Sequence, residues 1–198
     1  MSVLHQLQPG GRALMRRLRT HWRPHAMLVG AGSLTVDEAL QAVAEQFACH
    51  AGAAYELTVA SRWVQAQAVP PQLSEADGWQ QALSNWMTVL ELDEARLADD
   101  WVVRQARTAQ LHVITAMPRA LVDGVVALAR EHHVRVDRMG PWWGAALDEW
   151  LHQTGVETPS EQVFDDGDWV THARVDGASN GALTALWSEP RAMVGGRA

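Results

Sequence analysis

A glycine-containing turn is the first candidate for chemistry in this sequence. Residues 30–33, Gly-Ala-Gly-Ser, follow a short apolar stretch and precede a helix whose start is marked by the capping pattern of Thr35 and Glu38. Backbone amides at such a strand-to-helix junction can bind a phosphate group. The third glycine of the dinucleotide-binding fingerprint is missing, so we interpret residues 30–33, the glycine turn, as a structural turn.

Histidines and paired acids are the next candidates. Of the nine histidines, His132 and His133 are adjacent, so on a helix they point about 100° apart and cannot both face one metal ion. The aspartate pairs at 99–100 and 165–166 occupy turn positions, where carboxylates bond nearby amides. We therefore predict no metal site and no catalytic residue. A small enzyme that assembles carboxylates and histidines through its fold, such as His112 with the first aspartate pair, is the alternative.

Lysine is absent from this chain, since all 16 basic residues are arginine. A Walker-type phosphate loop, a Schiff-base enzyme and a lysine general base each need an ammonium group at a defined position. The composition excludes these three classes of site. We predict no cofactor.

Charge is unevenly distributed along the chain. Residues 1–25, the N-terminal arm, contain five arginines and no acid, whereas the rest has 11 arginines against 23 acids, a balance of −12. The arm predicts a short amphipathic helix, with Leu14, Met15, Leu18 and Trp22 on one face and Arg12, Arg16, Arg19 and Arg23 on another. Such a helix either docks on its own domain or contacts anionic lipid or an acidic partner. The acidic balance of the rest of the chain argues against nucleic-acid binding except through the arm. A regulator that binds DNA through the arm is a further alternative.

The elements that would position these residues follow from the apolar periodicity. We predict strands at 26–30, 55–60, 63–69, 101–106, 111–117, 134–139, 169–175 and 182–187, and helices at 35–50, 79–90, 118–132 and 141–155. The order of elements predicts an α/β fold with a mixed β-sheet and flanking helices. Residues 55–60 and 63–69 are close enough to pair as a hairpin, as are 169–175 and 182–187.

Domain boundaries and burial follow from the same pattern. Residues 26–188 are predicted to form a single α/β domain, and residues 189–198 a disordered tail. Gly124, inside a predicted helix, indicates close approach of that helix to a strand. Cys49, the one cysteine, lies in an apolar stretch, which predicts a small buried side chain. No apolar run is long enough for a membrane-spanning helix, and the first residues lack the apolar core of a secretory signal, so a cytoplasmic location is expected.

Ten tryptophans are unusual for a chain of 198 residues. Most lie at core-facing positions, where burial accounts for them. Trp142 and Trp143 differ, because neighbouring side chains on a helix point apart and one ring would remain outside the core. We predict that this pair anchors a protein partner, together with Arg12, Arg16, Arg19 and Arg23 of the arm.

A family resemblance enters between residues 55 and 151. The segments 57–64, 69–70, 111–118, 121–122, 134–136 and 140–142 resemble strand ends and turns of the actin-like proteins of bacterial type IV pilus assembly and type II secretion, namely PilM-like proteins and the cytoplasmic domain of GspL. The resemblance implies a ribonuclease-H-like, actin-like sheet. It also implies a location at the cytoplasmic side of the inner membrane and docking to short peptides of membrane partners or to an assembly ATPase.

The chain departs from this family in one respect that bears on function. PilM-like proteins carry an aspartate and glycines in an N-terminal phosphate hairpin, whereas this chain has only the glycine turn. It is therefore more similar to a reduced, GspL-like scaffold that binds no nucleotide. The expected function is a non-catalytic cytoplasmic adaptor in a pilus or secretion assembly platform, with protein partners of an inner-membrane complex and peripheral contact with anionic membrane through the arm.

Overall fold

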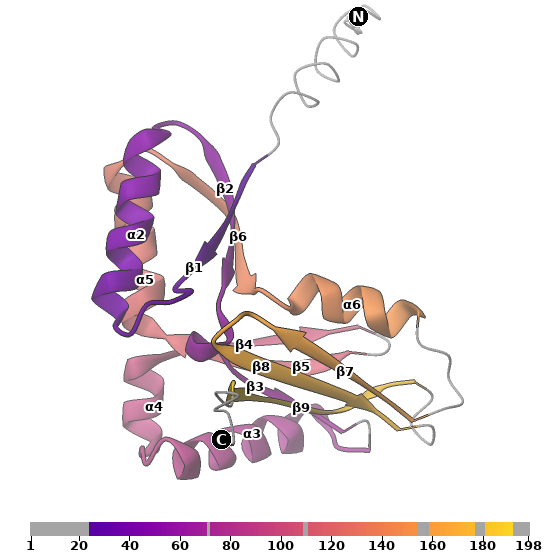
Figure 1. Ribbon diagram of the computed structural model, residues 1–198. Coiled ribbons are helices and arrows are strands. Elements are labelled where there is room, and N and C mark those ends of the chain that lie inside the picture. The colour runs from indigo at the N-terminus through magenta and orange to yellow at the C-terminus, as the bar shows by residue number, and fades with distance from the viewer. Residues whose placement is uncertain (1–23, 71, 109–110, 154–158, 177–180, 192–198) are drawn as a thin grey trace, which may run out of the picture.

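The computed structural model describes residues 24–70, 72–108, 111–153, 159–176 and 181–191. These residues form a mixed α/β fold, as predicted, but three separate three-stranded sheets replace the single expected sheet (Figure 1). The arm up to residue 23 and the tail from residue 192 lie outside the described residues. None of the described helices combines the length and apolar content needed to span a bilayer.

The first sheet is entirely parallel and contains strands far apart in sequence. Its order is β1 (His25–Val29), β2 (Ala54–Val59) and β6 (Arg135–Pro141). Helices α2 (Val36–Cys49) and α5 (Arg119–Glu131) lie side by side on one face (Figure 1). α2 begins with the predicted capping box, in which the Thr35 hydroxyl accepts from the Glu38 amide and the Glu38 carboxylate from the Thr35 amide.

The second sheet is antiparallel and is inserted between β2 and α5 in the sequence. Its order is β3 (Gln65–Ala68), β5 (His112–Pro118) and β4 (Trp101–Arg107). α3 (Glu75–Val89) and α4 (Glu94–Asp100) lie along one side of this sheet (Figure 1). The predicted hairpin of residues 55–60 and 63–69 is wrong, because the short 3-10 helix η1 (Ser61–Trp63) turns the chain so that β2 and β3 join different sheets.

The third sheet is a meander of β7 (Ser160–Asp165), β8 (Trp169–Val175) and β9 (Leu183–Pro190). The β8–β9 hairpin confirms the prediction. β7 was not among the predicted strands, and β9 extends two residues into the segment predicted as a disordered tail. α6 (Gly144–Gln153) lies above this sheet (Figure 1).

Two apolar clusters stabilise the described residues. The main cluster joins α2 and α5 to the parallel sheet and continues into the third sheet, and the second lies between α3, α4 and the strands β4 and β5. Two burial predictions need correction. Gly124 approaches Leu40 of α2 and not a strand, since a Cβ there would overlap the Leu40 side chain, and Cys49 is exposed because it lies at the last turn of α2.

Candidate functional site

The glycine turn connects β1 to α2, and its backbone requires glycine. Gly30 and Gly32 have positive φ angles of 80° and 72°, which glycine adopts without steric cost. The Trp63 ring packs over Gly30, and its Nε1 donates to the Gly30 carbonyl oxygen at 3.1 Å. A side chain at position 30 would overlap this ring, so the interpretation as a turn is confirmed.

The amides beside this turn face carboxylates of the β7–β8 turn. Asp168 Oδ2 accepts from the Gly32 amide at 3.1 Å, and Asp166 Oδ2 accepts from the Ser61 amide at 2.7 Å. Asp166 Oδ1 also accepts from the Trp169 amide at 2.8 Å, which closes its own turn. Groups that could receive a phosphate are thus already bonded to negative charge, and an anionic ligand would meet repulsion here.

A buried chain of side-chain hydrogen bonds, here called the polar junction, lies behind these turns. Trp142 Nε1 donates to Ser61 Oγ at 2.8 Å, and Ser61 Oγ lies 2.9 Å from Thr171 Oγ1, which lies 2.8 Å from Ser188 Oγ. Ser61 and Thr171 are almost fully buried. In the described part of the chain these hydroxyls bond to one another and to the Trp142 indole, so the polar junction holds η1 against β8 and β9.

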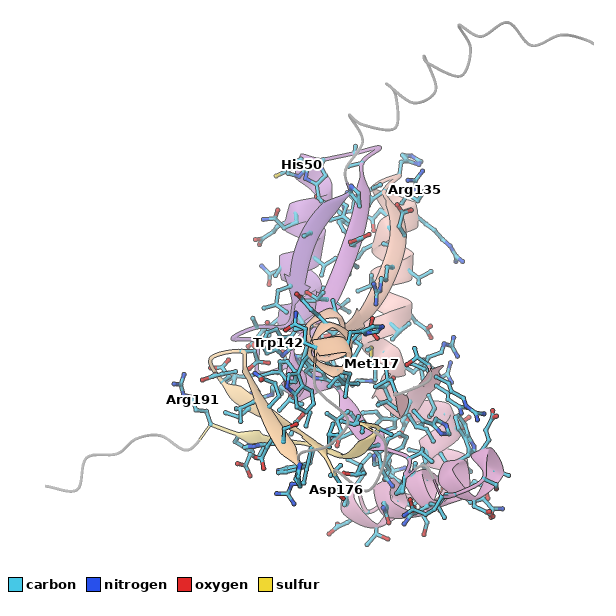
Figure 2. All side chains as sticks on the ribbon, turned by 90° about the vertical axis from the view of Figure 1, so that its right-hand side faces the viewer. His50, Met117, Arg135, Trp142, Asp176 and Arg191 are labelled. Atoms are coloured by element: carbon cyan, nitrogen blue, oxygen red, sulfur yellow. The ribbon has the colours of Figure 1, made fainter. Side chains whose placement is uncertain are left out.

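The tryptophan pair predicted to anchor a partner divides between two environments. Trp143 is only 2% exposed, and its ring belongs to the main apolar cluster. Trp142 is half-buried near the middle of the molecule (Figure 2), where its amide also donates to the Val59 carbonyl at 3.0 Å. Both residues lie in the turn that precedes α6 and not on the helix, and Trp142 packs partly against the same cluster, so the helical reason for an exposed ring was wrong. The role of the pair as an anchor stays a prediction, and the four arm arginines lie outside the described residues.

The enzyme alternative required His112 to lie near the aspartates at 99–100. In the β4–β5 ladder His112 pairs with Arg107, whereas Trp101, which follows the aspartates, pairs with Pro118 at the other end, about 20 Å away at strand spacing. Burial, followed by the Arg107 charge, lowers the pKa of His112 below its usual value. Among the described residues no cluster of three or more histidine, cysteine or acidic side chains could hold a metal ion. The enzyme alternative thus loses its candidate pair.

A cavity of about 550 Å³ opens beside β4, and we call it the β4 slot. Four consecutive β4 residues, 101–104, line it, which shows that it lies along the free edge of the strand. Its walls come from α3, α4 and α5. They include Trp79, Leu83, Leu97, Val122 and Val126, with Glu94 and Asp123 among the polar residues.

Arginine side chains cap part of the edge of β4. Arg119 Nη2 donates to the Trp101 carbonyl at 3.2 Å and to the Ala98 carbonyl at 2.9 Å, and its Nε donates to the Asp99 carbonyl at 2.8 Å. Arg104 Nη1 donates to the Val103 carbonyl at 3.2 Å. Since these carbonyls already accept hydrogen bonds, a ligand in the β4 slot would contact the apolar side chains of its walls more than unpaired backbone groups of β4.

Sequence reasoning missed the β4 slot, because four elements separated by up to about 50 residues assemble it. The one available signal was Val126, which follows Val125 on α5 and is 40% exposed while Val125 is buried. An exposed valine on an otherwise well-patterned helix can indicate a contact surface.

Comparison with known proteins finds similar solved structures, three of which are described here. A Bacteroides thetaiotaomicron protein described as having an actin-like ATPase fold and unknown function has 12% identity and a TM-score of 0.49, covering 80% of this chain and 56% of its own. The cytoplasmic domain of EpsL, an inner-membrane component of the Vibrio cholerae type II secretion system, has 13% identity and a TM-score of 0.37, covering 75% and 57%. The PilM–PilN type IV pilus biogenesis complex has 11% identity and a TM-score of 0.46, covering 74% and 47%.

These neighbours include both groups named by the resemblance in the sequence. The chain spans about half the length of each of these structures. No protein-family model and no curated protein matches the chain.

Proposed function

We propose that this chain is a non-catalytic adaptor of a type IV pilus or type II secretion-like assembly platform, and that the β4 slot holds a short segment of a protein partner. One observation carries the proposal. The slot is a preformed, mainly apolar cavity whose size suits a few side chains, bounded by helices and a strand. A cytoplasmic location, peripheral at the inner membrane, belongs to the same proposal.

The chemistry of the β4 slot defines the segment that it would hold. Trp79, Leu83 and Val126 favour two or three apolar side chains. Both arginines at the slot already donate to backbone carbonyls, whereas the Glu94 and Asp123 carboxylates form no ion pair with any described residue and can attract a cation. The expected ligand is therefore a short amphipathic segment with at least one basic residue.

Peptide selection tests this proposal. A phage-displayed library of short peptides is selected on the chain, and calorimetry measures binding of the synthetic winners. Val126→Glu should weaken their binding at least about tenfold, because a carboxylate would enter the apolar slot. The matched control is Val89→Glu, which changes a valine that is 70% exposed outside the slot and should leave affinity unchanged.

Two outcomes would contradict the adaptor proposal. Either no peptide is enriched, or the selected peptides bind Val126→Glu as tightly as the native chain. The assignment to a pilus or secretion platform has its own test. It loses its support if neighbouring genes in the host encode neither prepilin-like proteins nor secretion components.

A further inference from the structure

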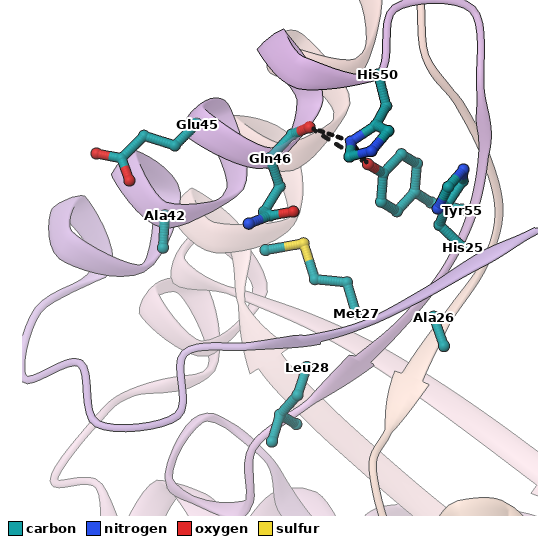
Figure 3. Close-up of a pocket in the computed structure, with 9 residues that line it drawn as sticks. All are labelled: His25, Ala26, Met27, Leu28, Ala42, Glu45, Gln46, His50 and Tyr55. Atoms are coloured by element: carbon teal, nitrogen blue, oxygen red, sulfur yellow. Dashed lines mark hydrogen bonds between the residues drawn. The ribbon is translucent and has the colours of Figure 1, made fainter.

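A second groove lies between β1 and α2 (Figure 3). β1 is the edge strand of the parallel sheet opposite β6. Its volume is about 380 Å³. Residues 25–28 of β1 and three residues of α2, Ala42, Glu45 and Gln46, line it. His50 and Tyr55 close the end at which β1 begins, with the Tyr55 hydroxyl 3.1 Å from His50 Nδ1.

No described element covers this side of the sheet. β1 pairs with β2 alone, so its other edge is unpaired within the described residues. Four of its five residues are exposed or half-buried, and Leu28 is 40% exposed. Proteins usually cover or blunt such an edge, because unpaired backbone groups and apolar side chains invite association.

The wall formed by α2 is acidic. This helix carries Asp37, Glu38 and Glu45 and no arginine. Glu45 accepts a hydrogen bond from Gln41 at 3.2 Å, and no described arginine forms an ion pair with it. The groove therefore combines apolar and aromatic side chains with uncompensated negative charge, which suits a basic amphipathic ligand.

We propose that the ligand of this groove is the chain's own arm, with residues 12–23 covering the edge of β1 against α2. The arm joins β1 directly through Pro24, so it is present at millimolar effective concentration. A helix of 12 residues is about 18 Å long, and a five-residue strand has a similar length of about 16 Å. A reversal at Pro24 therefore aligns the arm with β1 along its whole length.

The expected contacts follow from this alignment. Trp22, three residues before β1, reaches the end of the groove at His50 and Tyr55, where aromatic rings already stack against His25. The stripe of Leu14, Met15 and Leu18 covers Met27, Leu28 and Ala42, and the arginines lie beside Glu45. This contact makes the arm unavailable to anionic lipid, so membrane binding and docking on the groove are mutually exclusive. The inference does not depend on the function of the β4 slot.

The chain provides its own probe for this contact. Cys49 is the one cysteine, is exposed, and directly precedes His50 at the end of the groove. Bimane attached to Cys49 is quenched by a tryptophan that touches it. Trp22→Phe should therefore increase the fluorescence, and Trp79→Phe, which alters the β4 slot, is the matched control and should not.

Three further measurements test the contact, by changing the charge of the groove, the protein concentration and the lipid present. Glu45→Arg should also relieve quenching, while Glu131→Arg, at an exposed site on α5, should not. Quenching by Trp22 should not change on dilution, because the contact is within one chain, and anionic but not neutral vesicles should remove it. The proposal is overturned if Trp22→Phe and the native chain fluoresce equally, or if dilution abolishes the quenching, which would assign the groove to the arm of a second copy.

Discussion

The β4 slot and the polar junction are both assembled from distant parts of the chain, yet they differ in what they leave uncovered. In the polar junction Ser61, Thr171, Ser188 and the Trp142 indole satisfy one another, and the carboxylates beside them bond to backbone amides. The β4 slot instead leaves tryptophan, leucine and valine side chains in contact with solvent. In a polar cluster the side chains can satisfy all of one another's hydrogen bonds and leave none for a ligand. Apolar side chains that stay in contact with solvent keep the capacity to bind one.

The second apolar cluster, which contributes Trp79, Leu83 and Leu97 to the walls of the β4 slot, should give the largest effect. Trp86 of α3 is 3% exposed and belongs to the second apolar cluster. Trp86→Ala should lower the free energy of unfolding by about 3 to 5 kcal/mol, because it leaves a cavity. Chemical denaturation measures the loss, with Val89→Ala on the exposed face of the same helix as the control. A loss below about 1 kcal/mol would mean that the burial of Trp86 in this cluster is misassigned.

The polar junction should give the next effect. Thr171→Val keeps the side-chain shape but removes the hydroxyl that bonds to Ser61 and Ser188. The expected loss is about 1 to 3 kcal/mol, since buried hydroxyls would lose a partner. Thr88→Val, at an exposed helical site, is the control and should change stability by no more than about 0.5 kcal/mol. Equal losses for the two variants would remove the distinction between the polar junction and an ordinary surface.

A smaller effect should appear with pH at His112, the first residue of β5, which pairs with the end of β4 away from the slot. Burial and the Arg107 charge lower its pKa in the folded chain from the ordinary 6.5. The unfolded chain therefore binds a proton first as pH falls below 6.5, so stability decreases from that pH downward until the folded-state pKa is passed. His112→Gln should flatten this part of the pH dependence of the denaturation midpoint. His152→Gln, at an exposed site on α6, should leave it as it is.

The smallest expected effect is the heat of ATP binding at the glycine turn. Because the Gly32 and Ser61 amides already donate to Asp168 and Asp166, calorimetry with magnesium and ATP should show no saturable heat. Micromolar binding that Gly32→Val abolishes would contradict this and would make the turn a nucleotide site.

Local patterns in the sequence predicted much of the fold. The capping box at Thr35 and Glu38, the strands β4 and β5 and the β8–β9 hairpin each depend on residues close in the chain. The pairing of β2 could not be predicted in this way, because its partners are β1 and β6 and not the adjacent β3. β7 was missed as a strand because acidic and polar side chains occupy its exposed positions.

The candidate site was less predictable than the fold. The glycine turn was correctly interpreted, but nothing near it in sequence indicates that Asp166 and Asp168 would occupy its amides from more than a hundred residues away. The β4 slot depends on how α5 packs against α4, which Arg119 fixes through carbonyl contacts. Such contacts depend on tertiary structure and leave no periodic pattern in the sequence.

The insertion of the second sheet between β2 and α5 has a consequence for the order of folding. Leu57 of β2 pairs with Met139 of β6, about 80 residues later, whereas β7, β8 and β9 pair with sequence neighbours. Closing the longer loop costs more chain entropy, so the local meander and the β4–β5 hairpin are expected to form before the parallel sheet. Interactions that form after the rate-limiting barrier mainly slow unfolding. The β2–β6 pairing would then form late in folding and would affect the unfolding rate more than the folding rate.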